Sequence, residues 1–329
     1  RRLQFDELFF LQLAALVRKQ RVRLASAYAL PASEKEIEKH IASLPFTLTN
    51  AQKRTIQEIA HDMSEPHPMN RLLQGDVGSG KSAVALIAAK IALAHNKKVL
   101  YLAPTEILAR QQALSFQASL GEKKVYLLVG AMKQKEKSDI YERLQSSEPV
   151  CVIGTHALLQ EYVHAKNVGL AIIDEQHRFG VAQRKALLSI EEGIVPHLLS
   201  MTATPIPRTL SLTVYGDLEN SLLDELPPGR KPIVTRIVAS ENRDDAIIDM
   251  LTQLHAGRQA YIITPIIEDS EKLAVKSASK AFQEIQKLFP GIAVGMLHGK
   301  MDSDEKEGVM NNFAAGAIQL LVATAVVEV

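Results

Sequence analysis

The chain has 329 residues, 47% hydrophobic and 23% charged, as expected for a globular protein of about two domains. A single cysteine, Cys151, excludes an internal disulfide and a cysteine-based zinc cluster, and no apolar run approaches the ~20 residues that span a bilayer. The net charge of +1 means that any binding of phosphates must come from local patches. The first residues lack a signal-peptide pattern, so we expect a cytoplasmic protein without a membrane partner. We also expect a monomer.

Residues 1–44 are predicted to be helical. Apolar residues recur there at three- and four-residue steps, namely Phe5, Leu8, Phe9, Leu13, Leu16 and Val17. Pro31 interrupts this pattern, and a second helix begins after Ser33, which is a suitable N-cap. The basic run at 18–23 is interpreted as a solvated helix end, with contact to phosphates as the alternative.

From residue 45 onward, short apolar runs alternate with longer helical patterns. Strands are predicted at 71–74, 98–103, 124–129, 150–154, 170–174 and 197–201. Helices are predicted between most of them, for example over 82–96 and 105–120. This alternation predicts an α/β lobe with a mostly parallel sheet and helices on both faces.

A turn or linker is expected at 226–232, LPPGRKP, and the α/β alternation restarts after it. The predicted strands are 233–239, 259–267, 292–299 and 318–324, and the predicted helices are 241–256, 271–288 and 303–315. We therefore expect a helical linker segment over 1–44, a first α/β lobe over 45–230 and a second over 231–329. The last residues, ATAVVEV, directly follow a strand pattern, which we interpret as a cut within the second lobe.

The stretch GDVGSGKS at 75–82 fits the phosphate-binding pattern G-x-x-x-x-G-K-[ST] and lies between a predicted strand and a predicted helix. Lys81 would reach the β- and γ-phosphates, and the Ser82 hydroxyl would bind Mg²⁺. The alternative is a glycine-rich turn that binds nothing. The backbone that would surround the phosphates belongs to Gly75, Gly78, Ser79 and Gly80.

A pair of carboxylates, Asp174 and Glu175, ends the apolar run LAIID. Asp174 is the candidate partner of Mg²⁺, and Glu175 is the candidate that orients or deprotonates the attacking water. The alternative is an ordinary acidic turn after a strand. About a hundred residues after a phosphate-binding loop, however, such a pair favours a nucleotide hydrolase that uses ATP and Mg²⁺.

Two hydroxyls, Thr202 and Thr204 in SMTATP, follow the next apolar run. They could form hydrogen bonds with the region of Asp174 and Glu175 and sense the γ-phosphate. A polar turn before two prolines is the alternative. A second α/β lobe would allow closure on ATP and opening after hydrolysis.

Together these stretches resemble superfamily 2 helicases, and most closely the RecG family of ATP-dependent, branch-migrating DNA helicases. The resemblance covers nearly the whole chain. Its blocks here are GDVGSGKS, LAPTEILARQ, IGTHALLQ, AIIDEQHRFGVAQR, MTATPIPRTL, LPPGRKPIVTRI, PIIEDS, MLHGKM and LVATAVVEV. Transcription–repair coupling translocases carry a similar block but usually have Glu where this chain has Gln176.

The resemblance implies two RecA-like lobes in tandem and a set of residue roles. Gln52 would contact adenine, and His177 would join Thr202 and Thr204 in coupling hydrolysis to movement. Ordinary roles are the alternatives, such as loop histidines or a helix cap at Thr105. The residues that would lie near DNA, or face either DNA or the cleft, are Thr105, Thr155, His156, Arg178, Phe179, His298 and Thr324.

The function that the resemblance implies is a DNA motor acting on replication forks and Holliday junctions in recombination and repair. The family's DNA-splitting wedge and the arginine-bearing motif of its second lobe have no counterpart here. We therefore expect this stretch alone to bind nucleotide, hydrolyse it poorly and unwind nothing. The alternatives are a translocase of the transcription–repair coupling type and a nucleotide-binding fragment without motor activity.

Overall fold

The computed structural model describes residues 9, 10, 12, 13, 16, 17, 19, 20, 23–159, 165–176, 179, 193–204, 218–229, 233–264 and 271–324, apart from the side chains of 271–278, 303 and 304. The chain divides into two compact units, Arg1–Arg230 and Lys231–Val329. Among the described residues, no helix is both long and apolar enough to cross a membrane.

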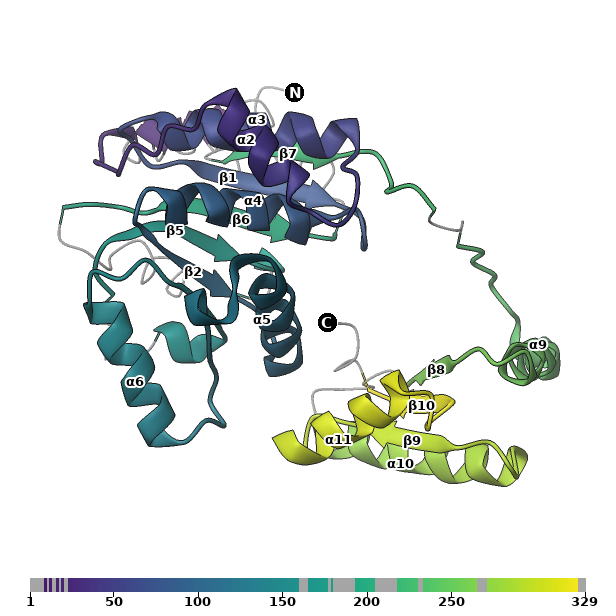
Figure 1. Cartoon of the computed structure of the whole chain (residues 1–329). Helices are drawn as coiled ribbons and strands as arrows, with labels where there is room; N and C mark the ends of the chain where they lie inside the picture. Colours follow the sequence, from purple (N-terminus) through teal and green to yellow (C-terminus); the bar gives the residue numbers. More distant parts are fainter. Residues whose placement is uncertain are drawn as a thin grey trace. The chain divides into compact units, whose positions relative to one another are not determined.

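The first unit is built on a seven-stranded sheet with the strand order β3-β4-β2-β5-β6-β1-β7. The strands β2, β5, β6, β1 and β7 of this sheet are labelled in Figure 1. Every pairing in it is parallel, as the alternation of strands and helices predicts. The strand β7 was not predicted. The strands are β1 (Asn70–Gly75), β2 (Lys98–Leu102), β3 (Val125–Leu128), β4 (Cys151–Gly154), β5 (Val168–Ile173), β6 (His197–Thr202) and β7 (Glu219–Leu223).

Alternate residues of the central strands enter two separate apolar cores, because successive side chains of a strand point to opposite faces. Tyr101 and Ile172 pack on the face covered by α3, α4 and α5, whereas Leu100 and Ile173 pack with α6. The predicted cover on both faces is therefore confirmed. The helices of this unit are α2 (Glu34–Ala42), α3 (Asn50–Ser64), α4 (Lys81–Ala94), α5 (Glu106–Leu120) and α6 (Gln134–Gln145).

The predicted N-cap Ser33 is confirmed, since its side chain accepts the Glu36 N–H while Glu36 accepts the Ser33 N–H. The prediction that all of 1–44 is helical is wrong for 24–33. Ser26 forms an isolated parallel bridge with Ile194 there, so the backbone of this stretch bonds to a neighbouring segment instead of to itself.

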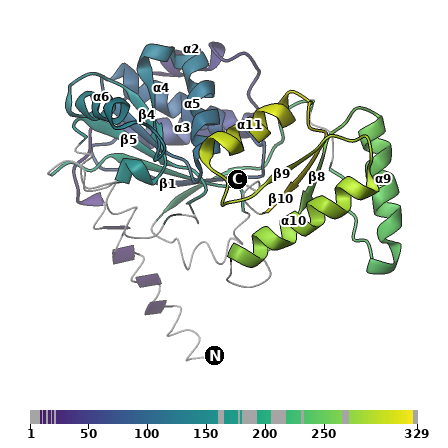
Figure 2. The same cartoon turned by 90° about the horizontal axis from the view of Figure 1, so that it is seen from below.

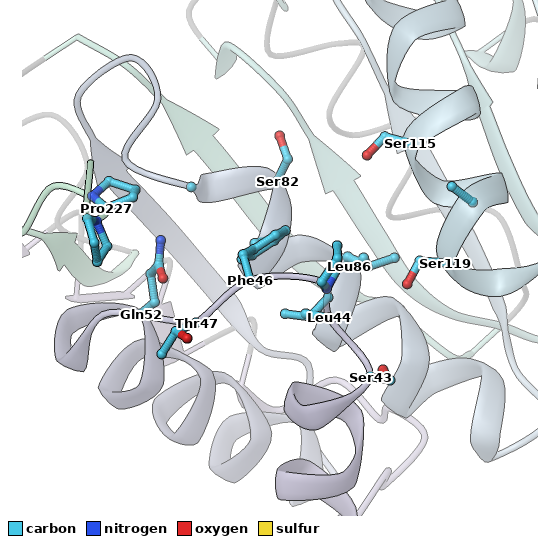
Figure 3. Close-up of a pocket in the computed structure, with 15 residues that line it drawn as sticks. Ser43, Leu44, Phe46, Thr47, Gln52, Ser82, Leu86, Ser115, Ser119 and Pro227 are labelled. Carbon is cyan, nitrogen blue, oxygen red and sulfur yellow. The ribbon is translucent and has the colours of Figure 1, made fainter. Parts of the chain in front are cut away.

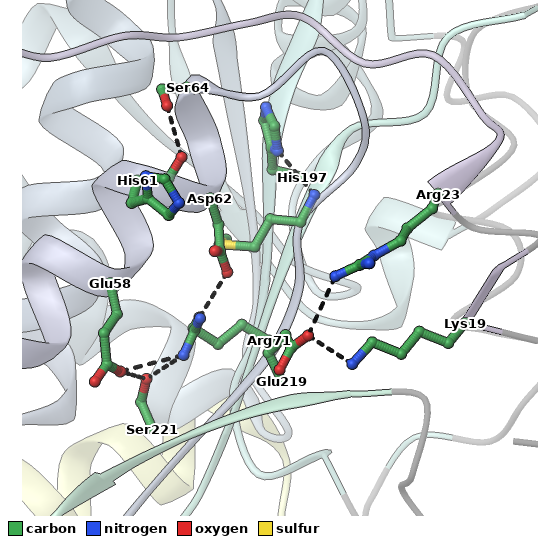
Figure 4. Close-up of polar contacts among 11 residues, drawn as sticks. Lys19, Arg23, Glu58, His61, Asp62, Ser64, Arg71, His197, Glu219 and Ser221 are labelled. Atoms are coloured by element: carbon green, nitrogen blue, oxygen red, sulfur yellow. Dashed lines mark hydrogen bonds and ion pairs between the residues drawn. The ribbon is translucent and has the colours of Figure 1, made fainter. Parts of the chain in front are cut away.

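Charged side chains join α3, β1 and β7 (Figure 4). The buried Arg71 of β1 donates to Asp62 (2.8 Å) and Glu58 (3.2 Å) of α3, and to the Ser221 hydroxyl of β7 (2.8 Å). From the basic run, Lys19 and Arg23 form ion pairs with Glu219 at 2.6 and 3.7 Å.

The second unit has a parallel three-stranded sheet in the order β8-β10-β9, formed by β8 (Ala260–Ile263), β9 (Val294–Leu297) and β10 (Leu320–Ala323). The helices α9 (Arg243–His255) and α10 (Glu271–Leu288) cover one face, and α11 (Ser303–Ala314) covers the other (Figure 2). These elements confirm three of the four predicted strands and all three predicted helices.

The strand predicted at 233–239 is wrong, because these residues form no strand. Their apolar residues do not enter a core, and Ile237 is fully exposed (101%). A β-branched run has strand propensity but needs a neighbouring strand for its hydrogen bonds, and this segment pairs with neither sheet.

Candidate nucleotide site and helicase motifs

The phosphate-binding loop leaves the carboxyl end of β1 and leads into α4. Gly78 and Gly80 adopt φ values of +73° and +88°, which glycine accommodates without strain. A Cβ on Gly80 would lie 2.2 Å from Nε2 of Gln52, so the glycine also allows a close approach by α3. The loop therefore has the open backbone that a phosphate group requires.

Lys81 is buried at the first position of α4, and its ammonium faces the loop. It donates to the carbonyl oxygens of Gly75 (2.8 Å) and Asp76 (3.1 Å). A positive charge next to the backbone groups of a helix N-terminus favours binding of a negatively charged polyphosphate.

Gln52 joins α3 to this loop. Its Oε1 accepts the Thr49 N–H (2.8 Å), which completes the capping box at the start of α3. Its Nε2 donates to the Ser79 carbonyl (2.7 Å). The residue expected to contact adenine is thus buried against the phosphate-binding loop.

A cavity of about 860 Å³ opens beside the loop, between the segment preceding α3, the start of α4 and one face of α5 (Figure 3). Gln52 and Ser82 line it together with the half-exposed ring of Phe46. A flat aromatic ring beside an amide is suited to a nucleobase, which stacks on the ring and bonds to the amide. Phe46 was not singled out from the sequence, although it lies in the same stretch, PFTLTNAQ, as Gln52.

The two acidic candidates lie at the carboxyl end of β5. Asp174 is buried, and its Oδ2 accepts the hydroxyl of the fully buried Tyr101 (2.9 Å). Burial raises the pKa of Asp174, and the charge of Glu175 adds to this, whereas the Tyr101 hydrogen bond and the charge of Lys81 oppose it. Burial and the charge of Asp174 raise the pKa of Tyr101 well above its ordinary value, so its hydroxyl keeps its proton.

Glu175 has φ +48°, an uncommon value for a residue with a side chain. Its Oε2 accepts the Ala203 N–H (3.2 Å), so the carboxylate bonds to the backbone between the two predicted hydroxyls. Thr202 and Thr204 instead share a hydrogen bond with each other (2.8 Å). The acidic pair and SMTATP therefore lie close together, as predicted. Among the described residues, the Glu175 carboxylate bonds to the Ala203 backbone amide and to neither of the two threonine hydroxyls.

Ser82 and Asp174 are oxygen donors of the kind that Mg²⁺ prefers, and Mg²⁺ typically takes few protein ligands beside nucleotide phosphates and water. Gln112 of α5 donates to the Ser82 hydroxyl (3.2 Å). The hydroxyl of Ser79 is buried with no partner among the described residues. This donor set fits a magnesium ion that arrives with a nucleotide.

The motifs expected to contact DNA are only partly described. Thr105 is the N-cap of α5 and accepts the Leu108 N–H (3.4 Å), as in the alternative interpretation. His156 is exposed, and its ring lies 5.4 Å from that of Phe179, which is 4% exposed. The Thr155 N–H donates to the carbonyl of Leu128. His177 and Arg178 lie outside the described residues.

In the second unit, His298 and Thr324 directly follow β9 and β10, so both stand at the carboxyl edge of its sheet. The Thr324 N–H donates to the Leu297 carbonyl (3.2 Å), which holds the two strand ends together. The side chain of Thr324 is buried, and Nδ1 of His298 has no partner among the described residues.

Residues 49–213 match the DEAD/DEAH box helicase family, and residues 242–329 match the helicase conserved C-terminal domain. The chain belongs to the DEAD/DEAH box helicases, and the expectation of RecA-like lobes is confirmed. Within this group, RecG proteins are among its relatives. It is 45% identical to the ATP-dependent DNA helicase RecG of Aquifex aeolicus, over the whole chain and 42% of that protein. It is 49% identical to RecG of Bacillus subtilis, over 90% of the chain and 44% of that protein.

The solved structure of RecG bound to a three-way DNA junction matches with a TM-score of 0.79 and 40% identity, covering 97% of this chain and 42% of that chain. The structure of Mycobacterium smegmatis helicase Lhr bound to ssDNA and AMP-PNP is 17% identical, with a TM-score of 0.62 over 89% of this chain and 42% of that chain, and shows the shared fold. The resemblance to the RecG family is therefore confirmed. The chain spans less than half the length of the RecG relatives it matches.

Proposed function

We propose that the chain is the ATP-driven motor of a DNA helicase or translocase that acts on forked and branched duplexes in recombination and repair. One observation carries the nucleotide part of the proposal. Lys81, Asp174 and Glu175 stand at the carboxyl ends of strands of one parallel sheet, the edge at which α/β proteins bind ligands. The RecG relatives are named ATP-dependent DNA helicases, which supports ATP as the hydrolysed nucleotide and DNA as the polymer along which the motor moves.

In this proposal Lys81 and the loop from Gly75 to Ser82 hold the phosphates, while Phe46 and Gln52 hold the base. Mg²⁺, bound by Ser82 and Asp174, would neutralise charge on the phosphates. Glu175 would orient the attacking water. The hydrogen bond from the Ala203 N–H to Glu175 supports a coupling role for the Thr202–Thr204 loop. Through this bond, a movement of the loop would move the Glu175 carboxylate, and a movement of the carboxylate would move the loop.

The DNA part of the proposal rests on the RecG relatives and on the three-way junction to which the RecG of the similar solved structure is bound. Thr105, Thr155, His156 and Arg178 would follow the phosphate backbone, which makes binding salt-dependent and largely independent of sequence. Because Phe179 is buried against the ring of His156, we assign it to holding this loop in place. His298 and Thr324 would belong to the second lobe's part of the motor.

A translocase of the transcription–repair coupling type is the nearest alternative, and Gln176 argues against it, because those proteins usually have Glu there. A nucleotide-binding fragment without motor activity is the alternative from another class. The proposed division is 1–44, 45–230 and 231–329, in a monomer that works in the bacterial cytoplasm. The proposed cytoplasmic location goes with the bacterial origin of the RecG relatives.

The test of the nucleotide site is binding of a fluorescent ATP analogue to the wild type and to Lys81→Ala. We expect saturable binding that needs Lys81, and Lys35→Ala is the control because Lys35 is an exposed residue of α2. Equal binding by Lys81→Ala would refute the site.

The DNA is tested by ATP turnover without DNA, with linear duplex and with forked duplex of equal length. Turnover stimulated most by the fork supports the junction motor. If the rate of ATP turnover is the same with and without each DNA, the chain would still be a nucleotide hydrolase, but DNA would be excluded as its substrate.

A further inference from the structure

Tyr101 is a buried tyrosine whose hydroxyl reaches the nucleotide site. It belongs to β2, and the neighbouring strand β5 ends at Asp174. Its ring packs edge to face on Phe116 of α5, with the ring centroids 5.5 Å apart. The apolar contacts of this side chain would suit phenylalanine equally well, whereas the hydroxyl donates to Oδ2 of Asp174 at 2.9 Å. That bond fixes the rotation of the carboxylate together with the Glu175 N–H, which donates to Oδ1 (3.1 Å).

Gln112 makes the corresponding contact on the other side of the site. Its amide lies against the Ser82 hydroxyl at 3.2 Å, and its Oε1 is buried with no partner among the described residues. The Nε2 N–H of Gln112 takes one lone pair of the serine oxygen and holds the hydroxyl in place. The other lone pair of that oxygen is left for a cation.

We propose that Tyr101 and Gln112 are positioning residues that orient Asp174 and Ser82 for the magnesium ion of the bound nucleotide. This inference rests on the proposed function, because it concerns the same site. β2 and α5 are consecutive elements, so one short part of the chain sets the orientation of both protein ligands. Tyr101 contacts Asp174 and Gln112 contacts Ser82, so each would act on the metal through the ligand that it holds.

The experiment is a titration of Mg²⁺ into the full chain with a fluorescent ATP analogue, preceded by the affinity for the analogue in EDTA. Loss of a hydrogen-bonded partner of a metal ligand typically lowers metal affinity about 10–100-fold. We therefore expect Tyr101→Phe to raise the half-saturating Mg²⁺ concentration about tenfold, with the affinity in EDTA unchanged. Gln112→Met is also expected to raise the half-saturating Mg²⁺ concentration.

The matched controls remove the same groups elsewhere. Tyr126→Phe deletes a hydroxyl that donates to the Lys123 carbonyl, and Gln111→Met changes an exposed residue next to Gln112. Both controls should keep the Mg²⁺ dependence of the wild type. Gln112 is only partly buried, so its variant gives a result even where Tyr101→Phe lowers the yield of folded protein.

An unchanged Mg²⁺ dependence in both variants overturns the proposal. It is also overturned when the affinities with Mg²⁺ and in EDTA fall equally, because that pattern means a purely structural role. Failure of the proposed function gives a different result: the wild type itself does not bind the analogue, or Lys81→Ala binds it as well as the wild type does.

Discussion

Replacing Arg71 by methionine tests whether its charge cluster holds α3 on the sheet. The Arg71 side chain is 9% exposed, and its guanidinium has three partners, Asp62, Glu58 and Ser221. Breaking a buried ion pair costs about 3–5 kcal/mol because a buried charge loses its partner. The exposed fractions of Asp62 and Glu58, 21% and 36%, let water solvate the released carboxylates, so we reduce the expected loss to about 2–3 kcal/mol.

For a unit of this size, each kcal/mol lowers the melting temperature by about 2–4 °C, so Arg71→Met should lower it by about 4–12 °C. The assay is thermal and urea unfolding followed by far-UV circular dichroism. Arg54→Met is the matched control. Arg54 lies on α3 and also pairs with a carboxylate, that of Asp224, but both side chains are about half exposed. The free energy of unfolding of Arg54→Met should fall by less than about 1 kcal/mol. Equal losses of unfolding free energy in Arg71→Met and Arg54→Met would refute the argument from burial.

Two further predictions concern Gly80 and His197. In Gly80→Ala, the Cβ would meet Nε2 of Gln52 at 2.2 Å and the φ of +88° would be strained, so the affinity for the ATP analogue should fall at least about tenfold. Gly121→Ala, with φ +91° and open space around its Cβ, should keep that affinity, and loss in both variants would point to backbone strain alone. The ring of His197 accepts the Met69 N–H at Nδ1 and donates from Nε2 to the Tyr28 carbonyl, and burial lowers its pKa. The unfolded chain therefore binds the proton more readily, so the stability that neutral His197 contributes is complete above about pH 6.5 and is lost as the pH falls below it. Unfolding by urea between about pH 7.5 and about 5.5 should show a smaller loss of stability for His197→Gln than for the wild type, and equal slopes would contradict this assignment.

The sequence predicts the elements whose signals are local. The strand before the phosphate-binding loop, the N-cap at Ser33 and the acidic pair after β5 all depend on residues close in sequence, and the structure contains each of them. The strand predicted at 233–239 failed because strand pairing is not local: a β-branched run looks the same with or without a partner strand. β7 was missed for the converse reason, since ENSLL carries little apolar signal and is held by pairing with β1.

The same distinction applies to the site. The positions of Lys81, Asp174 and Glu175 follow from the motif and the strand ends. The contact of Tyr101 with Asp174 joins residues 73 positions apart, and that of Gln112 with Ser82 joins residues 30 positions apart. Both depend on which strand neighbours which in the sheet and on how α5 rotates above it. A single sequence does not contain that order, so these two residues could be found only in the folded chain.

The two hydrogen bonds of Lys81 within its own loop affect how a ligand arrives and leaves. Lys81 is buried, and two of the three donors of its ammonium bond to the carbonyls of Gly75 and Asp76. In the proposed function, an entering phosphate group would replace these carbonyls as the acceptor, and the carbonyls would accept again when it leaves. The buried ammonium would then keep oxygen partners throughout the exchange, and a buried charge without partners is costly. In the proposed motor, which would release its nucleotide in every cycle, such an exchange of acceptors would favour release.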